Sequence, residues 1–134
     1  MPTSSVAGNF IADIMMSATK SDVTLLNSGT LRSDRIHHAG DFTLKDMLEI
    51  LPFPDSICVL AMTAHDVMLS LEAAVSKYPE HEGRFLQVAG LKFAFDPKRP
   101  VGERVCASDV TIDGEALDDN KVPYCSIFTS ILLM

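Results

Sequence analysis

The 134-residue sequence has no tryptophan, only three cysteines and no long hydrophobic run. Its longest apolar stretches, such as residues 57–62, fall far short of the roughly 20 residues that a membrane-spanning helix requires. Cys58, Cys106 and Cys125 are widely spaced and form no C-x-x-C pair, so neither a disulfide framework nor a zinc ribbon is indicated. The N-terminal residues show no basic segment followed by an apolar run, and hence no signal peptide.

Basic residues are also in short supply. Eleven Lys and Arg residues stand against eighteen Asp and Glu residues, which gives a formal net charge of -7. Binding to a DNA or RNA duplex requires clustered basic side chains, and the densest group here is only Lys98, Arg99 and Arg104. The sequence therefore argues against a duplex as partner, although one well-placed arginine is enough to hold a single phosphate.

The chain is long enough and apolar enough, at 47% hydrophobic residues, to form one globular domain over residues 1–134. Apolar periodicity and capping patterns predict helices over residues 8–18, 44–51 and 64–75. Apolar runs and alternation predict strands over residues 23–26, 57–62, 84–88, 91–95, 104–112 and 121–128. The pair Asp113-Gly114 predicts a turn between the last two of these strands. Helices fall in the first half and most strands in the second, so we expect an α+β fold with a mixed or antiparallel sheet.

Catalytic motifs are missing. Two-metal hydrolysis needs clustered Asp, His and Asn ligands, and the sequence has neither Asp-x-His nor Gly-Asn-His-Asp/Glu. It also lacks a P-loop and a nucleophile elbow, and neither His65 nor Cys58 has a partner at useful spacing for an independent small hydrolase. We therefore predict no catalytic residue and no metal-ligand set in this chain.

Two segments are candidates for binding. Asn27 to Arg32 directly follows the strand predicted at 23–26, where loops commonly carry function. Asn27 can donate and accept hydrogen bonds, and Arg32 carries a planar fork suited to carboxylate or phosphate, although a plain turn is the alternative. Phe53 lies between two prolines, so its ring either stacks on a nucleobase or fills the core.

Five segments together carry a family resemblance. In order they are Gly8-Asn9-Phe10-Ile11-Ala12-Asp13, Asp22 to Arg32 (DVTLLNSGTLR), Leu51-Pro52-Phe53, Gly83 to Phe93 (GRFLQVAGLKF) and Phe95-Asp96-Pro97. Their order and spacing, over nearly the whole chain, strongly resemble the C-terminal domain of the 5′-nucleotidase family. That family includes UDP-sugar hydrolases, cyclic-nucleotide phosphodiesterases and ecto-5′-nucleotidases.

The resemblance implies a substrate-recognition domain. Family members pair an N-terminal two-metal phosphoesterase domain with a C-terminal domain that holds the nucleoside, so a nucleotide or nucleoside is the implied partner. By position, Asn27 and Arg32 match polar substrate contacts, Phe53 matches one ring of an aromatic clamp, and Gly90 matches a backbone approach point near the base. The two divalent ions belong to the other domain, so no cofactor is expected here. Relatives are often extracellular or periplasmic, which leaves the compartment of this chain open.

The sequence also departs from the family pattern. A second arginine before the Gly-Asn helix start is missing, and only Phe128-Thr129-Ser130 stands where a Gly-Asp-Gly-Phe-like segment supplies the second ring. We therefore expect a domain truncated at both ends, inactive alone and a weak nucleoside binder. The alternative is a non-catalytic interaction or structural domain that keeps the fold without the ligand and self-associates through its apolar C-terminus, residues 131–134.

Overall fold

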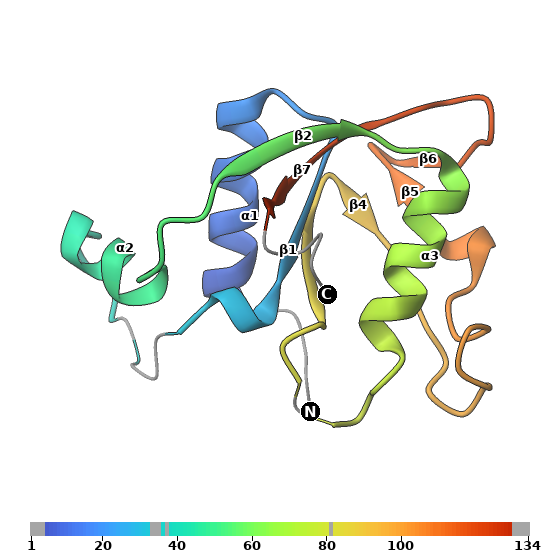
Figure 1. Ribbon diagram of the computed structural model, residues 1–134, viewed down its shortest axis with the longest axis horizontal. Helices are drawn as coiled ribbons and strands as arrows, with labels where there is room; N and C mark the ends of the chain where they lie inside the picture. Colours follow the sequence, from blue (N-terminus) through green and yellow to red (C-terminus); the bar gives the residue numbers. More distant parts are fainter. Residues whose placement is uncertain (1–4, 33–35, 37, 81, 130–134) are drawn as a thin grey trace.

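The computed structural model describes residues 5–32, 36, 38–80 and 82–129 (Figure 1). The helices are α1 (Val6–Thr19), α2 (Leu44–Ile50) and α3 (Ala64–Val75), with two short 3₁₀ turns, η1 (Ser28–Thr30) and η2 (Ala107–Asp109). The strands are β1 (Val23–Asn27), β2 (Ile57–Ala61), β3 (Leu86–Ala89), β4 (Leu91–Lys92), β5 (Thr111–Ile112), β6 (Glu115–Ala116) and β7 (Tyr124–Phe128). Residues 131–134, the predicted self-association segment, lie outside the described residues.

The strands form two sheets, and the α+β prediction is confirmed. The larger sheet has the order β2-β7-β1-β3, in which β1 runs parallel to β7 and the other pairs are antiparallel. The smaller sheet is the antiparallel meander β4-β5-β6. Its β5–β6 turn is the predicted Asp113-Gly114, with positive φ at both residues (50° and 78°), as a two-residue hairpin turn requires.

α2 and α3 start where the sequence predicts, whereas α1 starts at Val6, two residues before its predicted start. Thr63 begins α3 with a reciprocal capping box, in which Asp66 donates its backbone N–H to the Thr63 hydroxyl (3.1 Å) and accepts the Thr63 backbone N–H (2.9 Å). Thr43 begins α2 with the same arrangement. The Thr63 hydroxyl also donates to the Asp66 carboxylate (2.6 Å), and this bond, together with the one from the Thr63 N–H, holds the pKa of Asp66 below its usual value.

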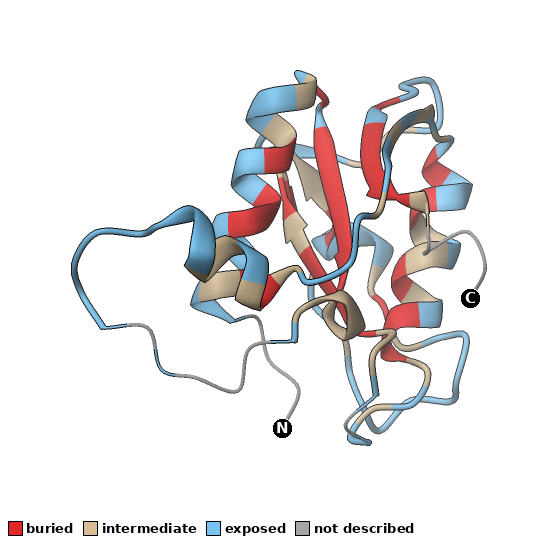
Figure 2. Ribbon diagram, turned by 60° about the vertical axis from the view of Figure 1, so that its left-hand side comes forward, coloured by how far each residue is buried: buried red, intermediate tan, exposed pale blue. Residues whose placement is uncertain are grey.

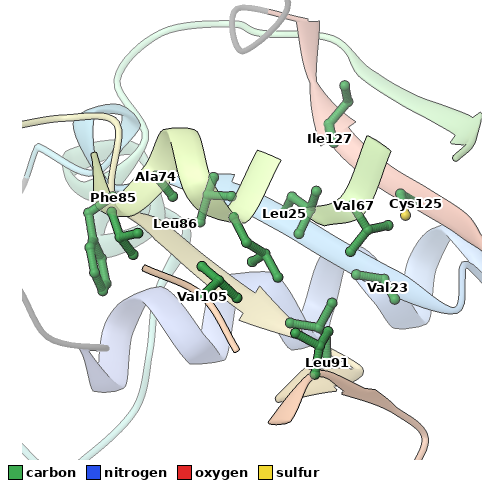
Figure 3. Packing of buried hydrophobic residues seen from close by; sticks show 13 residues of the cluster. Val23, Leu25, Val67, Ala74, Phe85, Leu86, Leu91, Val105, Cys125 and Ile127 are labelled. Carbon is green, nitrogen blue, oxygen red and sulfur yellow. The ribbon is translucent and has the colours of Figure 1, made fainter. Parts of the chain in front are cut away.

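Two hydrophobic clusters lie on opposite faces of the larger sheet. Leu25 belongs to the main cluster, which α3 covers with Val67, Leu71 and Val75 (Figure 3). The next residue along β1, Leu26, packs in a smaller cluster that includes Ile11 and Met15 of α1. Successive strand residues point to opposite faces, so α1 and α3 sandwich the sheet. Figure 2 shows the buried residues of both helices on their sheet-facing sides.

The predicted strand over residues 104–112 is wrong. It is reduced to an isolated bridge at Val105, the turn η2 and the two-residue β5. The segment bonds to α3 instead: Arg104 Nη1 donates to the Val75, Ser76 and Tyr78 carbonyls (2.7, 3.1 and 3.2 Å). The Val105 N–H donates to the Glu72 carboxylate (2.6 Å). These bonds therefore go to the carbonyl groups at the end of α3 and to the Glu72 side chain, and not to the backbone of a neighbouring strand.

Other predicted strands are shorter than expected. The strand over 91–95 ends at Lys92 except for one bridge at Phe95, and the last strand begins at Tyr124 rather than at residue 121. Turn bonds at Asp118 and the imino ring of Pro123, which lacks an N–H, delay that last strand. The sequence therefore located the pairing segments better than their ends.

Candidate functional site

The loop after β1 is held in place by backbone hydrogen bonds. Asn27 ends β1 and is buried, and its Oδ1 accepts the hydroxyl of Thr30 (2.6 Å). Ser28 donates its N–H to the Phe85 carbonyl (2.8 Å), which ties the loop to the chain entering β3. An added Cβ on Gly29 would lie 2.9 Å from the Cα of Gly83, so the two backbones touch here. The orientation of the Asn27 carboxamide is therefore fixed by its own loop.

Arg32 and Phe53 are brought together from separate loops. Arg32 donates its backbone N–H to the carbonyl of Ile50, the last residue of α2, at 2.9 Å. Its guanidinium carbon lies 5.9 Å from the centroid of the Phe53 ring, within the range of a cation–π contact. The Phe53 ring is 64% exposed, so it does not fill the core. An exposed ring and a permanent positive charge thus share one surface.

The far side of the Phe53 loop is tied to the end of β7. Thr129 donates its N–H to the Ser56 carbonyl (2.9 Å) and its hydroxyl to the Asp55 carboxylate (2.6 Å). Because β1 and β7 are parallel, Asn27 and Thr129 mark the same edge of the sheet. The loops that carry Arg32 and Phe53 are both anchored at this carboxyl edge.

Gly90 lies at the other end of the sheet. The register pairs Leu86 with Asn27 and Ala89 with Thr24, so Gly90 lies about 14 Å from Asn27 at about 3.4 Å per residue. It has φ of +72°, and an added Cβ would lie 2.1 Å from the carbonyl oxygen of Asp22. The positive φ and the close approach of the Asp22 carbonyl thus explain why residue 90 is a glycine. The structure does not bring Gly90 together with the other three residues, and its contact with a base stays a prediction.

A cavity of about 380 Å³ opens between α3 and the sheet, beside Asn27. Its lining is mostly apolar: Leu25, Leu60, Met62, Ala73, Ala74, Leu86 and Ile127, with Asn27, Ser70 and Arg84 as the polar members. Arg84 is engaged within the protein, because its guanidinium pairs with Glu82 and donates to the Ser76 hydroxyl (3.2 Å). Sequence reasoning missed Arg84, whose only signal is its place before the alternating residues of β3.

Candidate nucleophiles and metal ligands are few among the described residues. Burial, and secondarily the charge of Asp22, raises the pKa of the Cys125 thiol from 9.0 to about 12, which keeps it protonated. Cys58 and Cys106 are half-buried. Within the described ranges, no group of three or more His, Cys, Asp or Glu side chains is placed to hold a metal ion. The two loops therefore offer hydrogen-bonding groups, the Arg32 guanidinium and the Phe53 ring.

Comparison with known proteins identifies the family. The family model described as the C-terminal domain of 5′-nucleotidase matches residues 3–124. The chain belongs to the 5′-nucleotidase C-terminal domain family. Among curated relatives, the trifunctional nucleotide phosphoesterase YfkN of Bacillus subtilis is 32% identical over 102 residues. A 5′-nucleotidase of Vibrio parahaemolyticus is 30% identical over 107 residues.

Solved structures of this family share the fold. A 5′-nucleotidase precursor from Thermus thermophilus superposes with a TM-score of 0.86 at 32% identity, over 96% of this chain. The NAD nucleotidase of Haemophilus influenzae gives 0.78 at 26% identity, over 93% of this chain.

The relatives are much longer than this chain. It covers 26% and 23% of those two structures, 7% of the Bacillus relative and 19% of the Vibrio relative. In the relatives, this domain is therefore one part of a larger protein. Among the described residues, none of the helices is both long and apolar enough to span a bilayer.

Proposed function

We propose that this chain is the nucleotide-recognition domain of a 5′-nucleotidase-like metallophosphoesterase and that it holds the base and ribose of its substrate. The observation that carries the proposal is the apposition of the Arg32 guanidinium and the Phe53 ring. An aromatic face stacks on a nucleobase, and a guanidinium binds phosphate or hydroxyl oxygens through its N–H fork. Relatives that are named nucleotidases support the same substrate class.

Each of three residues has a distinct part in the proposal. Phe53 supplies the stacking face, and Arg32 supplies the positive charge for the phosphate or the ribose oxygens. Asn27 offers a carboxamide that Thr30 orients for hydrogen bonding to the base or ribose. The Arg32 guanidinium lies over the Phe53 ring, so a base either stacks on the opposite ring face or displaces the guanidinium toward the phosphate.

Ester hydrolysis is assigned to a different domain. In the proposal, an N-terminal metallophosphoesterase domain outside this chain holds two divalent metal ions, which activate water and stabilise the leaving oxygen. The present chain contributes binding and orientation. A second candidate, an interaction domain that keeps the fold without binding nucleotide, is favoured by one observation: the edge strand β2 is apolar and exposed.

Titration with AMP, adenosine and ribose 5-phosphate, followed by amide NMR shifts, tests the binding proposal. We expect AMP to shift the amide signals of residues 27–32 and 51–55, because those loops carry the contact residues. Amides beside Gly90 lie at the opposite end of β1, so they report separately on its predicted contact with a base. The absence of any shift around Phe53 at saturating AMP would remove the binding proposal and favour the second candidate.

An activity assay tests the division between the domains. We expect the isolated chain to release no phosphate from AMP in the presence of Mn²⁺ or Zn²⁺, since its sequence lacks the ligand motifs of a two-metal centre. Phosphate release should be measured against an Arg32→Ala variant and after repeated purification. Activity that survives purification and is lost in the variant would show that hydrolysis resides in this chain.

A further inference from the structure

β2 is an edge strand with the composition of an interior strand. It is the outermost strand of the larger sheet, and all five residues, Ile57–Ala61, are apolar (Figure 1). None of the five is fully buried, whereas the interior strands β1 and β7 are buried almost throughout. The sequence of β2 thus fits a strand with neighbours on both sides, while the described part of the chain provides a neighbour on one side only.

Among the described residues, no strand pairs with the backbone groups on the outer side of β2. Bonds at the Ser56 carbonyl (2.9 Å) and the Met62 N–H (3.0 Å) both run to the chain flanking β7. Because hydrogen-bonding direction alternates along an antiparallel strand, the N–H and C=O groups of Ile57, Val59 and Ala61 point away from β7. Within the part of the chain that the structure describes, no strand pairs with this side.

This edge also lacks the usual protection against pairing. Natural edge strands carry charges, proline or a bulge, or are covered, and β2 contains no charged residue, proline or glycine. Ile57 and Val59 are 44% and 43% exposed on one face. On the other face, Cys58 and Leu60 are half-buried, and Leu60 lines the cavity beside α3. A pairing strand would therefore meet apolar side chains on both faces.

We propose that the edge of β2 pairs with β2 of a second copy of this chain, antiparallel and centred on Val59. In this register Val59 faces its own counterpart, Ile57 faces Ala61, and Cys58 faces Leu60. On either side of the central pair, a larger side chain thus meets a smaller one. Every cross-strand pair is apolar, and none brings like charges together. Since one strand supplies both halves, the contact is isologous and closes as a dimer.

A second copy presents the same strand edge. Its β2 is apolar on both faces and uncharged, so it supplies a neighbouring strand of the same chemistry. Opposing the contact is the formal charge of -7 on each copy. That repulsion is long-ranged and falls as salt screens it, so the dimer should strengthen with ionic strength. This proposal is independent of nucleotide binding.

Sedimentation and amide exchange on the full chain test the pairing. From about 10 µM to about 1 mM protein, we expect a shift from monomer to dimer that moves to lower concentration as NaCl is raised. In the dimer, exchange of the Ile57, Val59 and Ala61 amides should slow by about tenfold or more. The Cys58 and Leu60 amides, which already face β7, should change little.

A matched pair of variants locates the contact. Val59→Lys should raise the dimer dissociation constant by about tenfold or more, because it places two ammonium groups directly opposite each other at the centre of the strand pair. Val101→Lys adds the same charge on an exposed turn and should change it by less than about twofold. A monomer at all concentrations, or a dimer whose protected amides lie away from β2, would overturn the proposal. If Val59→Lys fails to fold, the amide exchange pattern of the unaltered chain still shows whether β2 forms the contact.

Discussion

Gly90→Ala is expected to lower the free energy of unfolding by more than about 4 kcal/mol, a large share of the stability of a small domain. Gly90 has φ of +72°, which disfavours any residue with a Cβ. The added Cβ would also lie 2.1 Å from the Asp22 carbonyl oxygen and 2.8 Å from the Met16 sulfur. Asp22 cannot easily retreat, because its N–H donates to the Tyr124 carbonyl (2.9 Å). Urea denaturation, monitored by circular dichroism, measures the loss.

Gly102→Ala is the matched control for that experiment. Gly102 also has positive φ (+92°), but an added Cβ there meets no atom within 4 Å. It should therefore cost only the conformational penalty of about 1–2 kcal/mol. The difference between the two variants isolates the overlap with the Asp22 backbone. Equal losses would contradict the packing at Gly90.

Local signals were enough to predict α3 and the β5–β6 turn. The Thr63 cap, the apolar period that follows it and the Asp113-Gly114 pair each act within a few residues, and the structure has them as predicted. The predicted strand around Val105 failed because its hydrogen-bond partners, Glu72 and the end of α3, lie about thirty residues away in sequence. No residue pattern around Val105 indicates that this segment bonds to α3 and not to another strand.

The candidate site, like the fold, could be predicted from the sequence only in part. The sequence marked Arg32 and Phe53 separately, but the backbone bond from Arg32 to Ile50 that brings their loops together is a tertiary contact. Gly90 shows the converse: the family pattern places it near a base, while the β1–β3 register places it at the far end of β1. The apolar run of β2 gave no sign that the strand would be at an edge, because hydrophobicity alone does not distinguish edge from interior strands.

Phe53→Ala is expected to weaken adenosine and AMP binding by about 5- to 150-fold, which corresponds to the roughly 1–3 kcal/mol of one aromatic–base stack. The ring is 64% exposed, so its removal should leave the free energy of unfolding nearly unchanged. Affinity measured by the NMR titration, beside urea denaturation, separates the two quantities. A Phe53→Ala variant with unaltered affinity would show that the base stacks elsewhere.

Three further substitutions separate the contact to the base from the contact to the phosphate. Phe10→Ala removes an equally large ring that is 44% exposed on α1 and should leave affinity unchanged, whereas Phe53→Tyr keeps the stacking face and should bind like the parent chain. Arg32→Gln should weaken AMP binding more than adenosine binding, because only AMP offers the phosphate that a guanidinium binds most strongly. Equal losses for both ligands would place the Arg32 contact on the ribose or the base, with Phe53 still as the stacking face.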